Sequence, residues 1–309
     1  MSPLLKLTMW VLIGCVTMCH DVLFAGIRGQ IFYDTLEANG IERTYMIYNP
    51  AISDTKKLPL MIVLHGGLGN ADSISETTQM NTVADTGQFI VAYPNGTGGR
   101  IIAMKNRRTW NAGNCCGQAV KRNVNDVLFL ERMIDRIGSK FAVDKNRIYV
   151  AGISNGAMMA YRLACEIPDK IAAVIAVSGT LAVDNCDAAK NIPILHIHGD
   201  QDENVPFKGG KGARSLSGVY HRSVEDTIDL ILRSRTYLHP VAKKENDGIQ
   251  EFTYCSTDGA PVSLIVVKGG GHVWPGGHGR NNTLSDGCYI SASQEAWNFA
   301  KQFSKNAKE

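Results

Sequence analysis

Residues 147–166 read RIYVAGISNGAMMAYRLACE. The first part of this stretch is mostly apolar and contains β-branched residues, as in a buried strand, and the part from Asn155 onward has a helical pattern. Between the two lies the motif G-x-S-x-G, with Ser154 at its centre. A sharp strand–turn–helix needs small residues on both sides of the serine and leaves the serine hydroxyl exposed at the end of the strand. The stretch therefore predicts that Ser154 is a nucleophile, and the alternative is a serine that only caps the helix.

Strand-like and helix-like segments alternate along most of the chain around this motif. Such alternation predicts an α/β fold with a mainly parallel sheet and helices on both faces. The longest irregular stretch, residues 95–122, is rich in Gly, Asn and Arg, and a loop of that length is usually functional. The expected strands are 43–48, 59–64, 89–93, 147–151, 172–177, 193–197, 252–254 and 262–267, and the expected helices are 72–86, 124–141, 155–166, 223–238 and 294–304.

A catalytic serine needs a base and an acid that orients the base, and in this type of fold the acid and then the histidine follow the serine in the chain. Asp202 lies in a short loop after an apolar strand and is the favoured acid, with Asp200 and Glu203 as alternatives. His272 follows three consecutive glycines after the strand 262–267 and is the favoured base. His278, in a glycine-rich loop farther from a strand end, is the alternative base.

Hydrolysis through a serine also needs backbone N–H groups that stabilise the developing oxyanion. One donor is expected from Asn155, the residue after the nucleophile. The other is expected from the sequence HGGLG at residues 65–69, where Gly67 is favoured over Leu68. The alternative for this segment is an ordinary glycine-rich turn between a strand and a helix.

The N-terminus predicts export. Residues 7–18 read LTMWVLIGCVTM, an apolar run that fits a signal peptide but is too short to span a bilayer. We expect a signal peptide over residues 1–25 and one catalytic domain over residues 26–309, secreted to the periplasm or the medium. Two alternatives are a lipobox that would make Cys15 a lipid anchor, and an uncleaved N-terminal helix. Apart from such an anchor, no membrane attachment is expected.

Six cysteines remain after this cleavage, and an even number in an oxidising compartment favours disulfide bonds. They are Cys115, Cys116, Cys165, Cys186, Cys255 and Cys288. We expect at least one bridge, between Cys255 and Cys288, and Cys165 is expected to be buried at a helix end. No spacing matches a zinc motif, so neither a metal nor a cofactor is predicted.

The composition excludes several classes of protein. Of the 309 residues, 44% are hydrophobic and 20% are charged, which supports a large core and excludes intrinsic disorder. The net charge of +3 comes without a long basic run, so nucleic acid is not an expected partner. No internal repeat and no obligate protein partner is evident.

Several strings resemble a known family. They are His65-Gly66-Gly67, Thr109–Gly117 (TWNAGNCCG), Asn125–Leu130, Gly152–Gly156, His198–Pro206 (HGDQDENVP) and Gly271–Gly276 (GHVWPG). Together they resemble the α/β-hydrolase family of polyhydroxybutyrate depolymerases and LpqC-like feruloyl or acetyl-xylan esterases. The resemblance covers residues 44–303, and its tryptophan-containing strings are the most specific.

The resemblance implies a secreted carboxylic-ester hydrolase in which Ser154, Asp202 and His272 form the triad. It implies that Trp110 and Trp274 lie near the acyl or alcohol pocket, with packing as the alternative role. The adjacent Cys115 and Cys116 form a vicinal disulfide or pair elsewhere. The implied substrates are 3-hydroxybutyrate-type small or oligomeric esters, with feruloyl or acetyl-xylan esters as the alternative. A non-catalytic binding protein of the same fold is a remote alternative.

Overall fold

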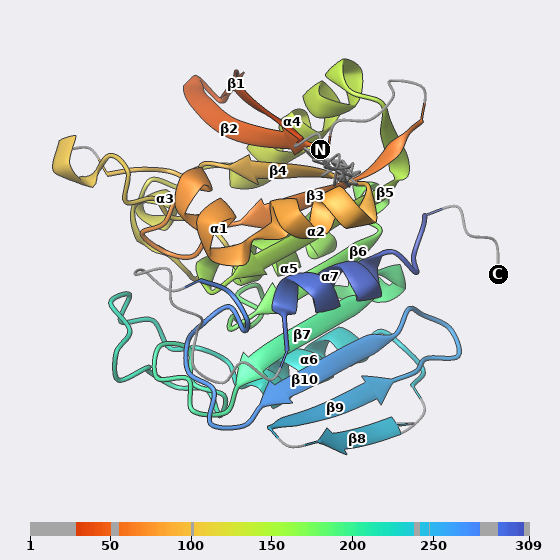
Figure 1. Ribbon diagram of the computed structural model, residues 1–309. Helices are drawn as coiled ribbons and strands as arrows, with labels where there is room; N and C mark the ends of the chain where they lie inside the picture. Colours follow the sequence, from red (N-terminus) through yellow and green to blue (C-terminus); the bar gives the residue numbers. More distant parts are fainter. Residues whose placement is uncertain are drawn as a thin grey trace, which may run out of the picture.

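Ten strands form one sheet in the order β1-β2-β4-β3-β5-β6-β7-β10-β9-β8 (Figure 1). The computed structural model describes residues 29–50, 56–99, 102–237, 242–246, 248–278 and 290–305. The expected signal peptide and lipobox lie outside these described residues. The strands are β1 Gln30–Ala38, β2 Ile41–Asn49, β3 Leu58–Leu64, β4 Ile90–Pro94, β5 Val143–Ile153, β6 Ala173–Val177, β7 Ile194–Gly199, β8 Ala242–Asn246, β9 Ile249–Tyr254 and β10 Val262–Val267.

The six central strands, from β4 through β10 in the sheet order, are parallel, and antiparallel strands close both edges. Every residue of β3 and of β10 is buried, because helices or loops cover both faces of these strands. The predicted α/β fold is therefore confirmed. Because the central strands are parallel, their carboxyl ends meet at one edge of the sheet, on the left in Figure 1.

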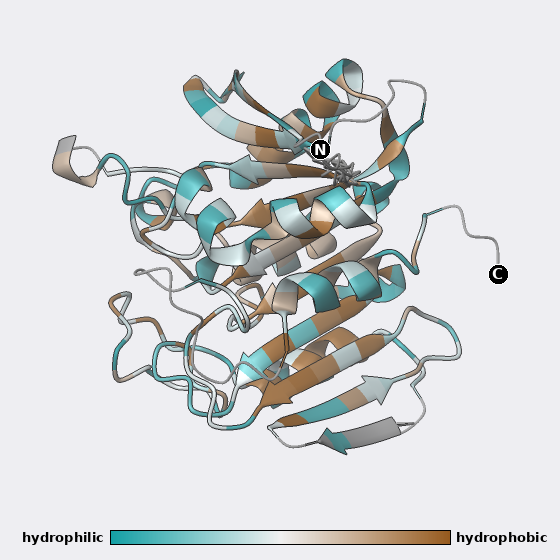
Figure 2. Ribbon diagram, in the orientation of Figure 1, coloured by the Kyte–Doolittle hydropathy of each residue, from teal (hydrophilic) through white to brown (hydrophobic). Residues whose placement is uncertain are grey.

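Helices cover the two faces of the sheet. α1, α2 and α7 pack on the face toward the viewer in Figure 1, and α4, α5 and α6 pack behind it. Figure 2 shows the consequence, since the central strands are largely hydrophobic and the outward turns of the front helices are largely hydrophilic. The helices are α1 Ala71–Thr78, α2 Met80–Gly87, α3 Gly117–Lys121, α4 Asp126–Lys140, α5 Asn155–Glu166, α6 Val224–Leu232 and α7 Ala292–Ala300.

Three elements differ from the sequence prediction. The hairpin of β1 and β2 was not expected, and its turn consists of Asn39 and Gly40, both with positive φ. The predicted helix 72–86 is two helices, because Gln79 between them adopts a left-handed conformation with φ 52°. β8 was also missed. In the described part of the irregular stretch 95–122, the helical elements are the short helix α3 and one turn of 3₁₀ helix, η1 Ile102–Met104.

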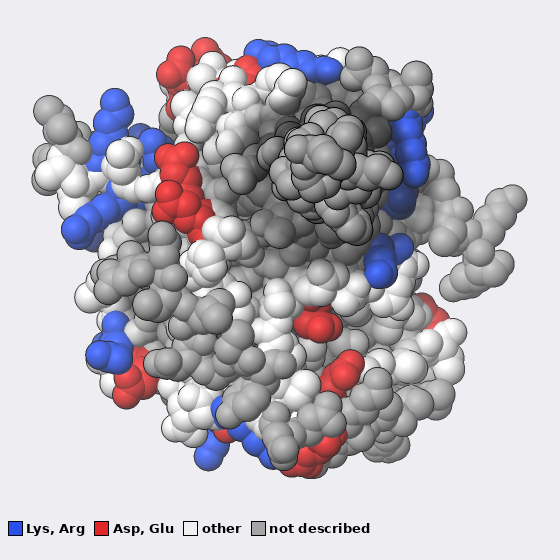
Figure 3. All heavy atoms as spheres, viewed as in Figure 1, with Lys and Arg blue, Asp and Glu red and all other residues white. Residues whose placement is uncertain are grey.

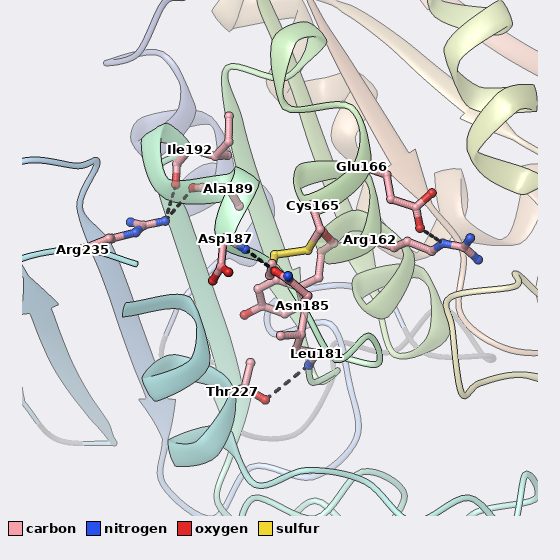
Figure 4. The surroundings of a disulfide bond; sticks show 12 residues. Arg162, Cys165, Glu166, Leu181, Asn185, Asp187, Ala189, Ile192, Thr227 and Arg235 are labelled. Carbon is pink, nitrogen blue, oxygen red and sulfur yellow. Dashed lines mark hydrogen bonds and ion pairs between the residues drawn. A yellow bond between two sulfur atoms is a disulfide. The ribbon is translucent and has the colours of Figure 1, made fainter. Parts of the chain in front are cut away.

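Two disulfide bonds are present among the described residues, which confirms the expectation of at least one. Cys165, in the last turn of α5, is bonded to Cys186, next to the 3₁₀ helix η3 Asp187–Asn191 (Figure 4). The expectation that Cys165 is simply buried at a helix end is therefore wrong, because its sulfur is bonded to Cys186. Cys115 and Cys116 are bonded to each other. Cys255 is a free thiol, which contradicts the expected bridge to Cys288, a residue outside the described ranges.

Candidate active site

Ser154 occupies a strained turn between β5 and α5. Its φ of 58° and ψ of −124° are rare for a residue with a side chain, and such strain is concentrated at functional sites. The turn depends on its glycines. A Cβ on Gly152 would lie 2.5 Å from the carbonyl carbon of Gly156, and a Cβ on Gly156 would overlap the carbonyl oxygen of Leu64. Positions 152 and 156 therefore have no room for a side chain. The tight turn that they allow holds the half-buried Ser154 at the carboxyl edge of the sheet.

Asp202 and His272 are hydrogen-bonded to each other. Asp202 lies in the loop after β7 and His272 in the loop after β10, the neighbouring strand. His272 Nδ1 lies 2.8 Å from Asp202 Oδ2, and the carboxylate is completely shielded from solvent while 18% of the histidine side chain is exposed. A carboxylate accepts from Nδ1–H, so this contact leaves Nε2 of a neutral His272 free to accept a proton.

The loop that carries His272 is tied to the strand beside the serine. Ser154 donates its backbone N–H to Val177 O, at the end of β6, at 2.8 Å. Ser178, which follows Val177 in the chain, donates its hydroxyl to Val273 O at 3.4 Å. Within the described residues, no hydrogen bond joins Ser154 Oγ to His272. In structures without substrate, catalytic hydrogen bonds are often long and shorten only in the complex. The arrangement brings the acid and the base into contact and places the serine at the same sheet edge.

Asp202 is held as a buried anion. Its Oδ1 accepts the backbone N–H groups of Asn204 and Val205, both at 2.8 Å. Burial alone would raise the pKa of Asp202, but the hydrogen bonds from His198 and His272 outweigh burial and hold the pKa well below its usual range. The carboxylate therefore stays charged and can fix the orientation of His272.

The alternative acids and base have other partners. Asp200 accepts the backbone N–H of Gly269 at 2.7 Å, and Glu203 is exposed and pairs with Arg214 at 3.3 Å. His278 donates its backbone N–H to Thr77 O in helix α1. Of the predicted acids, only Asp202 is in contact with His272 in the described structure.

Two backbone N–H groups near Ser154 are free to bind an oxyanion. A Cβ on Gly66 would lie 3.4 Å from Ser154 Cβ, and one on Gly67 would lie 4.0 Å from Asn155 Cβ, so the loop after β3 borders the serine. Neither Gly67 nor Asn155 donates its N–H to another described residue. Leu68, the alternative donor, already donates its N–H to Arg108 O at 2.7 Å. The geometry thus favours Gly67 over Leu68.

Trp110 holds the loop after β3 and the residue after the serine together. Its backbone N–H donates to Asn155 Oδ1 at 2.7 Å, and its carbonyl accepts from Asn155 Nδ2 at 3.1 Å. Its indole N–H donates to His65 O at 2.9 Å. The ring is fully buried, so the structure favours a packing and positioning role, and the expected contact of Trp110 with substrate stays a prediction.

Trp274 is also in the core. It is 2% exposed, and its indole N–H donates at 3.0 Å to the hydroxyl of Ser293 in α7. The Ser293 hydroxyl in turn donates to Thr78 O at 2.6 Å. These contacts join the His272 loop to two helices of the front face. They favour packing as the role of Trp274, and its predicted contact with substrate also stays a prediction.

Sequence reasoning missed a buried chain of side chains behind Asp202. His198 Nε2 lies 2.8 Å from Val205 O and 3.4 Å from Asp202 Oδ2. The other ring nitrogen of His198, Nδ1, lies 3.0 Å from His196 Nε2. His196 Nδ1 in turn lies 2.6 Å from the hydroxyl of Tyr161. The only sequence signal is the position of His196 and His198, two residues apart on the strand before Asp202.

His221 is a second residue whose place was not foreseen. It is only 4% exposed although its sequence neighbours are polar, and its Nε2 has no hydrogen-bond partner among the described residues. Burial, followed by the nearby His272, lowers its pKa. His221 therefore remains neutral beside the Asp202–His272 pair.

A cleft of about 830 Å³ borders Asp202 but includes neither Ser154 nor His272. It lies between α6 and the strands β9 and β10, with apolar residues such as Phe207 and Phe252 and several carboxylates on its wall. On the face drawn in Figure 3, acidic and basic side chains are interspersed. The described residues contain no cluster of His, Cys, Asp or Glu suited to a metal ion, and no helix among them is long and apolar enough to cross a membrane.

Comparison with known proteins identifies the family. The chain is 30% identical to the protein designated esterase NocK from Nocardia uniformis subsp. tsuyamanensis, over 74% of this chain and 68% of NocK. It is 28% identical to feruloyl esterase B from Piromyces equi, over 81% of this chain but only 43% of that protein. The solved structure of an acetyl xylan esterase from Aspergillus awamori superposes with a TM-score of 0.59 at 16% identity, over 87% of this chain and 99% of that one, and supports the fold.

The sequence profile of one family covers more than half of the chain. This family is described as Esterase PHB depolymerase, and its profile matches residues 43–235, which include Ser154 and Asp202. The match agrees with the resemblance seen in the sequence motifs and with the α/β-hydrolase fold of the structure. The chain belongs to the Esterase PHB depolymerase family and is a carboxylic-ester hydrolase.

Proposed function

We propose that the protein hydrolyses esters through a Ser154–His272–Asp202 triad and an acyl-enzyme on Ser154. The observation that carries this proposal is the 2.8 Å hydrogen bond between His272 Nδ1 and the buried Asp202 at the sheet edge where Ser154 is strained outward. A serine, a free imidazole nitrogen and a buried carboxylate in this order are the groups that nucleophilic ester hydrolysis requires.

In the first half of the reaction, Ser154 Oγ attacks the ester carbonyl while its proton passes to His272 Nε2. The tetrahedral intermediate collapses, the bond to the alcohol oxygen breaks, and His272 returns the proton to the departing alcohol. In the second half, His272 takes a proton from water, the hydroxide attacks the acyl carbon, and the acid is released as Ser154 regains its proton. Asp202 stabilises the imidazolium formed in each half without itself taking the proton.

The oxyanion of each tetrahedral intermediate accepts hydrogen bonds from the N–H groups of Gly67 and Asn155. This assignment is supported by the two groups having no other acceptor among the described residues, whereas the N–H of Leu68 is occupied. Asn155 also begins helix α5, and the positive end of that helix favours negative charge. Fixed donors of this kind are worth roughly 10²–10³ in rate for one donor.

We propose 3-hydroxybutyrate-type small or oligomeric esters as the substrates, because the family profile is that of the PHB depolymerases. Feruloyl or acetyl esters of plant cell walls are the second candidate. The 28% identity to feruloyl esterase B favours this second candidate. The chain spans less than half of that relative, so the comparison covers one part of it.

We propose that the protein is exported. The two disulfide bonds support this, because stable disulfides form in the periplasm and outside the cell and are rare in the cytosol of most organisms. The apolar run at residues 7–18 is the proposed signal for this export.

The experiment is a panel assay of the wild type and three variants on 3-hydroxybutyrate oligomers, methyl ferulate, acetylated xylan and short p-nitrophenyl esters. Ser154→Ala and His272→Ala are each expected to reduce kcat by roughly 10⁴–10⁶, because triad members act as a unit. Asp202→Asn causes a comparable or smaller loss. A preference of at least tenfold in kcat/KM for the hydroxybutyrate oligomers supports the first substrate class, and the reverse preference supports the second.

A further inference from the structure

We propose that Tyr161, His196 and His198 form a buried positioning chain that orients the Asp202 carboxylate toward His272. The inference rests on the proposed roles of Asp202 and His272. It assigns a function to three residues that touch neither the ester nor the nucleophile, and it links helix α5, which begins directly after Ser154, to the acid of the triad.

The chain lies inside the hydrophobic core. His196 and His198 stand on β7, on the face that packs against α5, and Tyr161 belongs to α5 itself. All three residues are fully buried. Every polar atom of their side chains has a partner, whereas a core of apolar residues of similar size would be at least as stable. A complete polar chain in such a place indicates a role other than stability.

The hydrogen bonds of the chain have one direction. Val205 O can only accept, so His198 carries its proton on Nε2. The hydroxyl of Tyr161 donates to His196 Nδ1, so a neutral His196 carries its proton on Nε2 and donates it to His198 Nδ1. Burial raises the pKa of Tyr161, and burial together with nearby His198 lowers the pKa of His196, so both side chains remain neutral.

This direction matters at Asp202. His198 Nε2 donates to Val205 O at 2.8 Å and also lies 3.4 Å from Asp202 Oδ2, the same carboxylate oxygen that contacts His272. The donor therefore fixes both the loop, through Val205, and the rotation of the carboxyl group. The dipoles of the chain all point their positive ends toward the anion, which stabilises its charge.

A pair of tyrosine variants isolates this effect from loss of stability. Tyr161→Phe removes only the hydroxyl that sets the tautomer of His196. Tyr149→Phe is the matched control, because Tyr149 is also fully buried and its hydroxyl donates a single hydrogen bond, to Phe303 O at 2.8 Å. We expect similar losses of thermal stability in both variants, but a kcat lowered about 3–10-fold at unchanged KM only in Tyr161→Phe.

A pair of substitutions at His198 tests the donor directly. His198→Leu removes the donor and is expected to lower kcat by about 10–100-fold at nearly constant KM, by analogy with other positioning hydrogen bonds. In His198→Gln the side-chain amide can donate from near the position of Nε2, so a large part of the rate is restored. Equal kcat values in the two variants would contradict the inference. Should His198→Leu fail to fold, the tyrosine pair and the spectroscopic test below decide.

Nuclear magnetic resonance of protein labelled with ¹⁵N-histidine gives a readout that does not depend on turnover. We expect neutral His196 and His198 with the proton on Nε2, and a low-field His272 Nδ1–H signal that shifts in Tyr161→Phe but not in Tyr149→Phe. A charged His198, a proton on Nδ1 of His198, or wild-type kcat with an unchanged signal in Tyr161→Phe overturns the positioning chain. Turnover by Ser154→Ala instead overturns the proposed function, while the tautomers still report on the chain.

Discussion

Arg43 and Asp126 form a buried ion pair, with Arg43 Nη2 2.7 Å from Asp126 Oδ1 and both side chains almost completely shielded from solvent. The guanidinium also lies over the ring of Phe129, 4.0 Å from its centroid. Asp126 accepts the backbone N–H of Asn111 at 2.8 Å, so the pair holds the segment directly after Trp110. The ion pair therefore supports the loop that positions the proposed oxyanion donors.

Removing one partner of this buried pair should lower the free energy of unfolding far more than removing one partner of an exposed ion pair. Arg43→Met leaves the buried Asp126 carboxyl group without its cationic partner, and we expect a loss of about 3–5 kcal/mol in the free energy of unfolding. Arg43→Met with Asp126→Asn should recover about half of that loss, because the neutral amide can still accept from Asn111. Urea denaturation measures both, with Lys190→Ala as the control for the exposed Lys190–Asp258 pair. A loss below about 1 kcal/mol in Arg43→Met would contradict the prediction.

Asn155 should matter through its side chain as well as its backbone. Asn155→Ala keeps the proposed oxyanion N–H but leaves the N–H of Trp110 buried without a partner, and its C=O keeps only the N–H of Cys116. We expect kcat to fall about tenfold, with a lower unfolding temperature, because the loop after β3 loses its link to α5. Steady-state kinetics on a short p-nitrophenyl ester test this, with the exposed Asn185→Ala as the control. An unchanged kcat would show that the clamp does not position the donors.

His65 should make stability depend on pH. Its Nε2 accepts the N–H of Gly96 at 3.0 Å and its Nδ1 donates to Gly66 O at 2.8 Å, so protonation of Nε2 would break the first bond. Burial is the main cause that lowers the pKa of His65 to about 4 from its usual 6.5. The unfolded chain therefore takes up a proton that the folded protein refuses between these values, and stability falls as the pH falls.

The expected contribution of His65 is about 1.4 kcal/mol per pH unit between pH 6.5 and 4. His65→Gln offers an oxygen acceptor to Gly96 and takes up no proton, so its stability should depend less steeply on pH. Buried His196 and His221, whose pKa values are also lowered, act in both proteins, so the difference between the two slopes isolates His65. Denaturation curves at pH 5 and 7 provide the slopes, and identical slopes would show that His65 titrates normally in the folded state.

Much of the central sheet could be predicted from the sequence because its parallel strands are continuous apolar runs. β1 was missed because it is an edge strand whose apolar side chains, including Phe32 and Tyr33, are exposed. The pair Asn39-Gly40 was an available signal for its hairpin, since both residues adopt positive φ there. The break at Gln79 had no such signal, because a left-handed glutamine depends on how α1 and α2 pack.

The site could be predicted only where chain order and local turns determine it. The motifs placed Ser154, Asp202 and His272 at the ends of strands that the sheet brings to one edge, and their catalytic roles stay predictions. The positioning chain was out of reach, because Tyr161 and His196 are 35 residues apart and meet only through the packing of α5 on β7. The burial of Trp110 and Trp274 likewise follows from tertiary packing that their motifs do not reveal.

The Cys165–Cys186 disulfide should stabilise the back face of the sheet. It closes a loop of 21 residues in sequence separation and anchors η3 to α5 (Figure 4). In the chain-entropy model such a loop is worth about 3 kcal/mol. The double variant Cys165→Ala with Cys186→Ala should lose about that free energy of unfolding and still hydrolyse esters. A loss below about 1 kcal/mol would mean that the bridge does not constrain the unfolded chain as expected.

The free thiol of Cys255 has its own test. Alkylation of denatured, unreduced protein, followed by peptide mass mapping, should modify Cys255 and leave Cys165 and Cys186 joined. Reduction before alkylation is the control and should make all of these thiols reactive. A peptide that links Cys255 to Cys288 would instead restore the bridge expected from the sequence.

The central claim is that the ester passes through a covalent intermediate on Ser154. Wild-type protein mixed with a short-chain p-nitrophenyl ester, quenched with acid within the first turnover and mapped by mass spectrometry, reports that intermediate directly. The account predicts one acyl group on the peptide that contains Ser154, and no acyl group on that peptide in Ser154→Ala. Steady hydrolysis by the wild type without an acylated Ser154 peptide, or hydrolysis by Ser154→Ala at a rate near that of the wild type, would contradict it.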